Sequence, residues 1–168
     1  MKEFIGVFEQ GNQDLMSEQF KIQSSSTGNE AFISNGDDAN ASARLAVNAD
    51  KQKASKELAL TAARAADDRK AADIVLLQVG EVSYLADYFA IATGFSRVQV
   101  RAIAQSIEQK VETEWQRLPL RVEGKAEGSW ILLDYGDVII HILLPPEREF
   151  YNLEAFWGHA EKIDFSAS

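Results

Sequence analysis

Residues 130–144 decide the fold, because they read as two short strands and a tight turn: Trp-Ile-Leu-Leu-Asp-Tyr-Gly-Asp-Val-Ile-Ile-His-Ile-Leu-Leu. The runs 130–134 and 138–144 are apolar and rich in β-branched residues, as strands are. Between them Gly136 can adopt the positive φ that tight hairpin turns require. The following Pro145 and Pro146 end the second strand. This stretch therefore predicts a β-hairpin.

The segments on either side of this hairpin alternate between helical and extended patterns. Apolar runs predict buried strands at residues 74–79 and 87–93, and a shorter strand at 120–123. Apolar residues at helical spacing predict helices over 55–72, from Ser96 towards Pro119, and over 147–158. Ser96 and Gln99 have the spacing of a capping box. The order predicts an α/β (α+β) fold with a mixed, roughly five-stranded sheet flanked by helices.

The first 53 residues have a different composition from the rest. Residues 23–28 read Gln-Ser-Ser-Ser-Thr-Gly and residues 34–38 read Ser-Asn-Gly-Asp-Asp. Such polar, turn-forming stretches bury too little apolar surface to offset the entropy lost on ordering. We therefore expect a flexible polar extension over residues 1–53, a folded domain over 54–160 and a C-terminal tail over 161–168.

Charge and composition limit the classes of function. The 168 residues have a formal net charge of −9 and an isoelectric point near 4.7, which argues against extensive binding to nucleic-acid phosphates. The chain has no Cys and two His, which excludes disulfides and thiolate zinc sites. No apolar stretch is long enough to span a membrane. The acid-rich first 55 residues are unlike a transit peptide, so a cytoplasmic protein is expected.

Two carboxylates flank the predicted turn. Asp134 and Asp137 could together hold a divalent cation, but Asp is also a common turn residue that bonds its own backbone. The second explanation is favoured, since no third ligand is evident. The alternative function is a metal-dependent nucleotidyltransferase that uses Asp134 and Asp137.

The remaining candidates are aromatic or charged residues near the C-terminus. His141 lies in an apolar strand, on the face of Ile139 and Leu143, where a structural or interface role is more common than general-base catalysis. On the last predicted helix, Phe150, Leu153 and Trp157 are expected in the core. Tyr151 and Glu154 then face elsewhere, and an exposed Tyr beside charges is typical of a contact surface. Trp130 fits either the core or an interface.

These motifs also resemble the ribosomal silencing factor (iojap-related) family. The most specific are Gly-Ser-Trp-Ile-Leu-Leu-Asp-Tyr-Gly-Asp-Val-Ile-Ile-His at 128–141 and Arg-Glu-Phe-Tyr-Asn-Leu-Glu-Ala-Phe-Trp at 148–157. Weaker matches lie at residues 71–75, 87–94, 97–100 and 122–124. The resemblance implies a translational repressor that binds the large ribosomal subunit through its protein fourteen and keeps the small subunit away under nutrient limitation. It also implies a fold similar to nucleotidyltransferases.

The resemblance further implies a binding protein without catalytic residues, cofactor or metal. Nucleotidyltransferases need a Gly-Ser pair and two carboxylates one residue apart, whereas here Phe95 separates Gly94 from Ser96 and the two Asp are three apart. We expect little direct nucleic-acid contact and no membrane contact. The oligomeric state is left open between a monomer and a homodimer. The partner-binding residues expected are Trp130, Asp134, Asp137, His141, Arg148, Tyr151 and Glu154.

Overall fold

The computed structural model describes residues 38–165, with side chains from residue 42 onward. The chain divides into two units, residues 1–44 and 45–168. Of the first unit, only the start of helix α2 (Asp38–Asp67) is described.

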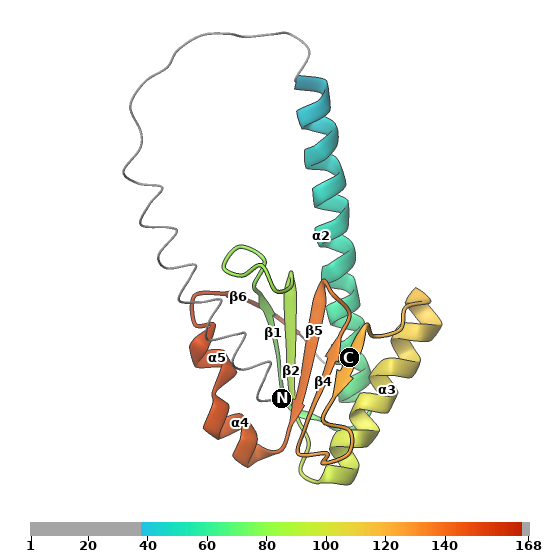
Figure 1. The fold of residues 1–168 in the computed structure, drawn as a ribbon, viewed down its shortest axis with the longest axis vertical. Coiled ribbons are helices and arrows are strands. Elements are labelled where there is room, and N and C mark those ends of the chain that lie inside the picture. Colours follow the sequence, from blue (N-terminus) through green and yellow to red (C-terminus); the bar gives the residue numbers. More distant parts are fainter. Residues whose placement is uncertain (1–37, 166–168) are drawn as a thin grey trace. The chain divides into compact units, whose positions relative to one another are not determined.

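A six-stranded mixed sheet forms the centre of this unit (Figure 1). Its strand order is β3-β4-β5-β2-β1-β6. The strands are β1 (Ala72–Gln78), β2 (Tyr88–Thr93), β3 (Arg121–Glu123), β4 (Trp130–Asp134), β5 (Val138–Leu143) and β6 (Glu161–Ile163). The expected hairpin is β4 and β5, which pair antiparallel. The α/β fold class predicted from the sequence is thus confirmed.

The central pair, β2 and β5, runs parallel while the other neighbouring strands run antiparallel. Tyr88 lies opposite Val138 and Thr93 opposite Leu143. Every residue of both strands is buried, which explains their nearly continuous apolar sequences. The parallel register brings the starts of the two strands together at one end and their ends together at the other.

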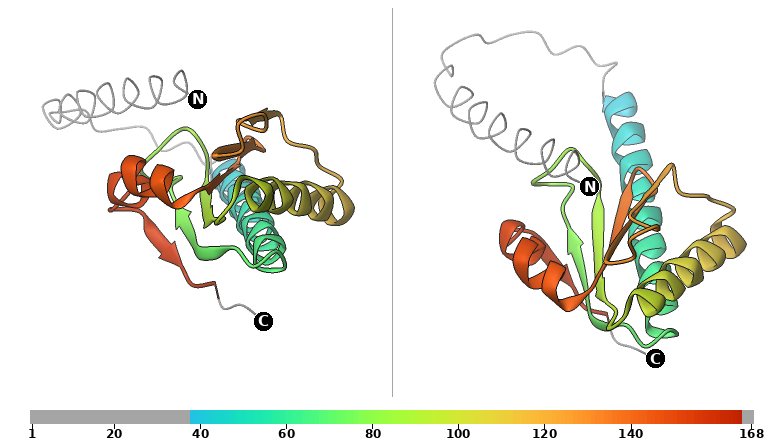
Figure 2. Two further views of the ribbon diagram at one scale, coloured as in Figure 1. Left: turned by 90° about the horizontal axis from the view of Figure 1, so that it is seen from below. Right: turned by 60° about the horizontal axis from the view of Figure 1, so that its bottom comes forward.

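Helices cover both faces of this sheet (Figure 2). Helices α2 and α3 (Arg97–Trp115) pack on one face, where Ile140 and Ile142 join the core formed with Leu58 and Ile103. The opposite face carries Phe89, whose ring contacts those of His141 and Trp157. Helices α4 (Pro145–Tyr151) and α5 (Leu153–Phe156) lie on that side. Alternation along β5 therefore places His141 opposite Ile140 and Ile142, as the sequence predicts.

The predicted cap of α3 is present. The Ser96 hydroxyl accepts a hydrogen bond from the backbone N–H of Gln99, at 3.1 Å. The Gln99 side chain accepts from the N–H of Phe95, at 2.8 Å, one residue before the cap to which it was expected to return. This satisfies an additional amide at the helix start.

Two boundaries differ from the sequence-based expectations. Helix α2 begins at Asp38 rather than near residue 55, so residues 38–53 of the expected extension are helical. Residues 42–54 are exposed, and this part has no apolar face from which a helix could be recognised. Residues 161–163 of the expected tail form β6, which pairs with the outer edge of β1.

The last helix is also interrupted. Asn152 adopts a left-handed conformation with φ of 43° and separates α4 from α5. The break changes the helical phase, so Phe150, expected in the core, is 80% exposed. Leu153 and Trp157 are buried as expected.

In the described part of the chain, no helix has the length and apolar character needed to cross a membrane.

Removing residues 1–53 should leave folding nearly unchanged, because residues 42–54 are exposed. We expect the fragment 54–168 to melt cooperatively, within a few degrees of the full chain. Differential scanning calorimetry on both proteins measures this. A melting temperature lower by about 5 °C or more, equivalent to about 1 kcal/mol in a domain of this size, would contradict the prediction.

Candidate partner-binding site

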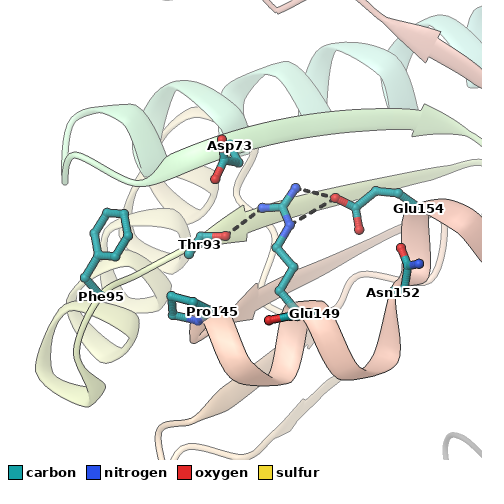
Figure 3. Close-up of a pocket in the computed structure, with 8 residues that line it drawn as sticks. Asp73, Thr93, Phe95, Pro145, Glu149, Asn152 and Glu154 are labelled. Carbon is teal, nitrogen blue, oxygen red and sulfur yellow. Dashed lines mark hydrogen bonds and ion pairs between the residues drawn. The ribbon is translucent and has the colours of Figure 1, made fainter.

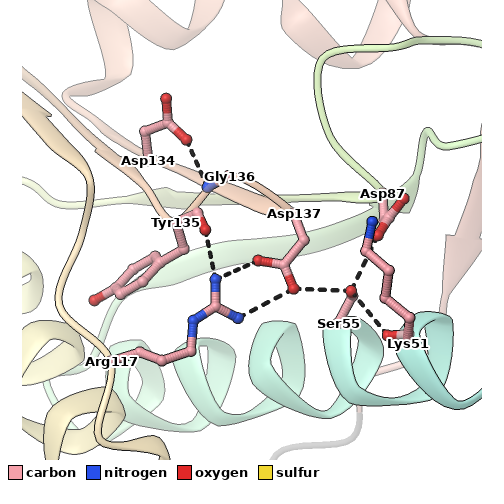
Figure 4. Close-up of polar contacts among 8 residues, drawn as sticks. All are labelled: Lys51, Ser55, Asp87, Arg117, Asp134, Tyr135, Gly136 and Asp137. Carbon is pink, nitrogen blue, oxygen red and sulfur yellow. Dashed lines mark hydrogen bonds and ion pairs between the residues drawn. The ribbon is translucent and has the colours of Figure 1, made fainter.

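A polar network lies at the end of the sheet where β2 and β5 begin (Figure 4). The carbonyl of Asp137 accepts hydrogen bonds from the N–H groups of Asp87 and Tyr88, at 2.8 and 3.1 Å. The buried Ser55 hydroxyl, from α2, lies 2.9 Å from an Asp137 carboxylate oxygen and 3.0 Å from one of Asp87. Two strand starts and one helix therefore meet at a single hydroxyl.

Arg117 provides the positive charge of this network. Its guanidinium donates to both carboxylate oxygens of Asp137, at 3.1 and 2.5 Å, and to the carbonyl of Tyr135. Burial alone would raise the pKa of Asp137, but the hydrogen bonds from Arg117 and Ser55 outweigh it and lower the pKa. Asp137 is therefore held as a carboxylate that fixes α2 and the segment after α3 against the sheet.

Asp134 makes a separate set of contacts. Its carboxylate accepts from the N–H of Gly136 at 2.8 Å, which is the turn bonding expected of Asp. It also pairs with Arg121 at 3.6 Å. The carboxylates of Asp134 and Asp137 point away from each other (Figure 4). Among the described residues, no three His, Cys, Asp or Glu side chains are grouped to hold a metal ion, so the geometry gives the metal-dependent alternative no support.

A second polar centre lies at the other end of the central strands (Figure 3). Arg148 of α4 donates to the Thr93 hydroxyl at 2.7 Å and to the Glu154 carboxylate at 3.0 Å from Nε, with a further bond from Nη2. These groups border a pocket of about 330 Å³ that also includes Phe95 and Asp73. Because Glu154 neutralises Arg148, this centre ties α4 and α5 to the end of β2.

An aromatic cluster joins α4 to the sheet. The Trp130 indole donates to Nδ1 of His141 at 3.2 Å, and its ring centroid lies 4.7 Å from that of Tyr151. Trp130 is 3% exposed and His141 is fully buried. Burial lowers the pKa of His141 to about 3, so the ring is neutral at physiological pH. In the isolated chain, both residues belong to the core.

The structure therefore distributes the seven predicted contact residues over separate places. Trp130, His141 and Tyr151 form one cluster, with Arg148 and Glu154 at the nearby end of the sheet. Asp134 and Asp137 lie at the opposite end. A contact role for the seven stays a prediction.

Sequence reasoning missed Ser55, Asp87 and Arg117. Asp87 and Asp137 each precede an apolar strand, and this shared position is a signal that parallel strands would bring them together. Ser55 and Arg117 have no comparable signal, since one lies within a helix and the other in an irregular loop. The exposed Phe150 was missed because the helix was assumed to continue past Asn152.

The fold and these contacts define a class: a mixed α/β domain whose polar groups fix its helices to the sheet. The model of the family described as "Ribosomal silencing factor during starvation" matches residues 52–168. The chain belongs to this family.

Individual relatives agree with the family match. The ribosomal silencing factor RsfS of Bacillus subtilis is 40% identical over 109 residues, which are 65% of this chain and 92% of that protein. The chloroplastic protein Iojap of Arabidopsis thaliana is 43% identical over 107 residues, 63% of this chain and 44% of that protein. The mouse protein named "Mitochondrial assembly of ribosomal large subunit protein 1" is 33% identical over 89 residues, 52% of this chain and 39% of that protein.

A solved structure shares the fold. The crystal structure of a protein from Chromobacterium violaceum superposes with a TM-score of 0.59 at 34% sequence identity. The match covers 67% of this chain and 92% of that one.

The two turn carboxylates should differ in their effect on stability. Asp137→Asn removes the charge that faces Arg117, and we expect a loss of about 1–2 kcal/mol in the free energy of unfolding, since the pair is partly exposed. Asp134→Asn keeps an acceptor for Gly136 and should cost less than about 0.5 kcal/mol. Urea unfolding of both variants measures the difference. Equal losses in the free energy of unfolding would show that the contacts of Asp137 with Arg117 and Ser55 stabilise the fold no more than those of Asp134.

His141 should make stability depend on pH. Its folded-state pKa of about 3 lies below its ordinary value of 6.5, so the unfolded chain binds a proton first as the pH falls. The contribution of the neutral His141 ring to the free energy of unfolding is therefore present above about pH 6.5 and is lost as the pH falls. The loss between pH 7.5 and pH 5 should be about 2 kcal/mol. Urea unfolding at several pH values should show this decline.

The two histidines offer a matched pair of variants for this test. His141→Gln should flatten the pH dependence, because Gln does not titrate. His159→Gln should preserve it, because His159 is exposed. A wild-type stability that is flat between pH 7.5 and pH 5 would refute the assignment of His141 as a buried neutral ring.

Proposed function

We propose that the chain is a ribosomal silencing factor that represses translation when nutrients are limiting. It binds the large ribosomal subunit through protein fourteen of that subunit and prevents the small subunit from joining. The observation that carries this proposal is the family match over residues 52–168. The name of the mouse relative refers to the large subunit and supports the choice of subunit.

The exposed side chains of α4 and α5 support the proposal that the partner is a protein. The acidic and aromatic face of these helices, defined here as Glu149, Phe150, Tyr151, Glu154 and Phe156, includes two large exposed apolar side chains: Phe150 is 80% exposed and Phe156 is 41% exposed. Exposed aromatic side chains supply most of the binding energy at protein interfaces. The exposed carboxylate of Glu149 beside them favours a basic partner.

The buried predicted residues have a supporting role in this proposal. Trp130 packs against Tyr151, and His141 accepts the hydrogen bond of the Trp130 indole. Arg148 holds Glu154 in position. These contacts fix two members of the acidic and aromatic face before binding, which reduces the entropy lost in the complex.

Repression by this route needs no chemical step. A bound domain that occupies the subunit interface excludes the small subunit by volume alone. We place this action in the cytoplasm, as expected from the sequence. If Asp134 or Asp137 contacts the partner directly, that contact lies at the end of the sheet opposite Arg148.

A subunit-joining assay tests the proposal. Purified large subunits are incubated with the chain, small subunits are added, and sucrose-gradient sedimentation measures the joined fraction. We expect the wild-type chain to lower that fraction and to sediment with the large subunit. Phe150→Ala should weaken binding to isolated protein fourteen about tenfold or more, because it removes an exposed anchor.

Tyr84→Ala is the matched control, since Tyr84 is 92% exposed and lies in the loop between β1 and β2. It should leave both measurements unchanged. An unchanged joined fraction at excess wild-type chain would refute the proposed function. Sedimentation equilibrium of the free chain also measures whether two copies associate into a homodimer.

A further inference from the structure

Three segments meet at the start of α3. The Gln99 side chain donates to the carbonyls of Arg69 and Lys70, at 3.2 and 3.0 Å, and so holds the turn between α2 and β1. The Arg101 guanidinium donates to the carbonyls of Lys125 and Ala126, at 2.9 and 2.6 Å, and so holds the turn between β3 and β4. The turn between α2 and β1 and the turn between β3 and β4 therefore both contact the first turns of α3. Figure 2 shows the same helices and strands from two further sides.

This junction concentrates exposed positive charge. Arg69, Lys70, Arg97 and Arg101 are all exposed, and none takes part in the ion pairs found among the described residues. Arg101 bonds only to carbonyls, which leave its charge uncompensated. We call these four residues the basic face. In a chain of net charge −9, it is a local exception.

Neighbouring acids are engaged elsewhere or lie at the border. The carboxylate of Asp68 pairs with Lys110 at 3.1 Å, and Glu108 pairs with Lys125 at 2.8 Å. The first turn of α3 contains no acidic residue. Asp73 lines the pocket beside Arg148, and Glu127 lies in the turn between β3 and β4. Two of the acidic residues near the basic face are therefore paired with lysines outside it.

An exposed aromatic residue, Phe95, comes two positions before Arg97 of this face. Phe95 is 66% exposed and Val98 is 75% exposed. The backbone of Phe95 is held by its hydrogen bond to Gln99, and the residue lines the same pocket as Asp73 and Arg148 (Figure 3). An exposed aromatic ring next to positive charge is an arrangement by which proteins stack an unpaired base and bind the adjacent phosphates.

We propose that the basic face binds the phosphodiester backbone of RNA, with Phe95 stacking on an unpaired base. Arginine is suited to this role because its planar guanidinium can donate two parallel hydrogen bonds to a phosphate. That the RNA is ribosomal rests on the proposed function. The low nucleic-acid contact expected from the sequence came from net charge, which does not reveal how the charges are distributed.

Binding of the full chain to a fluorescein-labelled RNA hairpin with an unpaired loop tests this proposal without ribosomes. Fluorescence anisotropy gives the dissociation constant between 50 and 200 mM salt. The triple variant R69Q/K70Q/R97Q should bind at least about tenfold more weakly at low salt, and the slope of log affinity against log salt should become shallower by about 2. Phe95→Ala should weaken binding about fivefold or more.

The matched control is K51Q/K53Q/K162Q, which removes the same charge from exposed positions on α2 and β6. It should bind the hairpin nearly as well as the wild type. Equal losses in the two triple variants would overturn the proposal, and so would absence of wild-type binding at 50 mM salt. Binding to anionic lipid vesicles without binding to RNA would also overturn it. Since no ribosome is present, these outcomes are independent of the subunit-joining result.

Discussion

The parallel pairing of β2 with β5 is the constraint on which the rest of the structure depends. Both strands are buried along their whole length, so the register that places Tyr88 opposite Val138 cannot slip without moving an apolar face to the wrong side. This register brings Asp87 and Asp137 together at one end. At the other end it places Thr93 within reach of Arg148. The positions of the helices follow from these two ends.

Each end of the central pair fixes a different layer. Ser55 and Arg117 attach α2 and the segment after α3 to Asp137, while Arg148 and Glu154 attach α4 and α5 to β2. The buried contacts between Trp130, His141 and Tyr151 add to the second attachment. A domain fixed in this way presents its exposed side chains in one arrangement, which suits a protein that acts by occupying a surface.

The sequence predicts the elements whose signals are local. The hairpin and the Ser96 cap follow from spacing and turn chemistry, and both are confirmed. The extent of α2 is missed because residues 42–54 are exposed and have no apolar face, and β6 is missed because three residues are too few to show a period. The contact residues are less predictable. Trp130 is buried against His141 and against Tyr151 of α4, and only the tertiary structure brings these residues together.

A cryo-electron microscopy reconstruction of the large ribosomal subunit with the full chain bound is the most direct test of the account. We expect density for the domain against protein fourteen, with Phe150 in that contact and the side chain of Arg97 within hydrogen-bonding distance of a ribosomal RNA phosphate. The bound domain should also overlap the position of the small subunit. A domain bound away from the subunit interface, or with α4 facing solvent, would contradict the account.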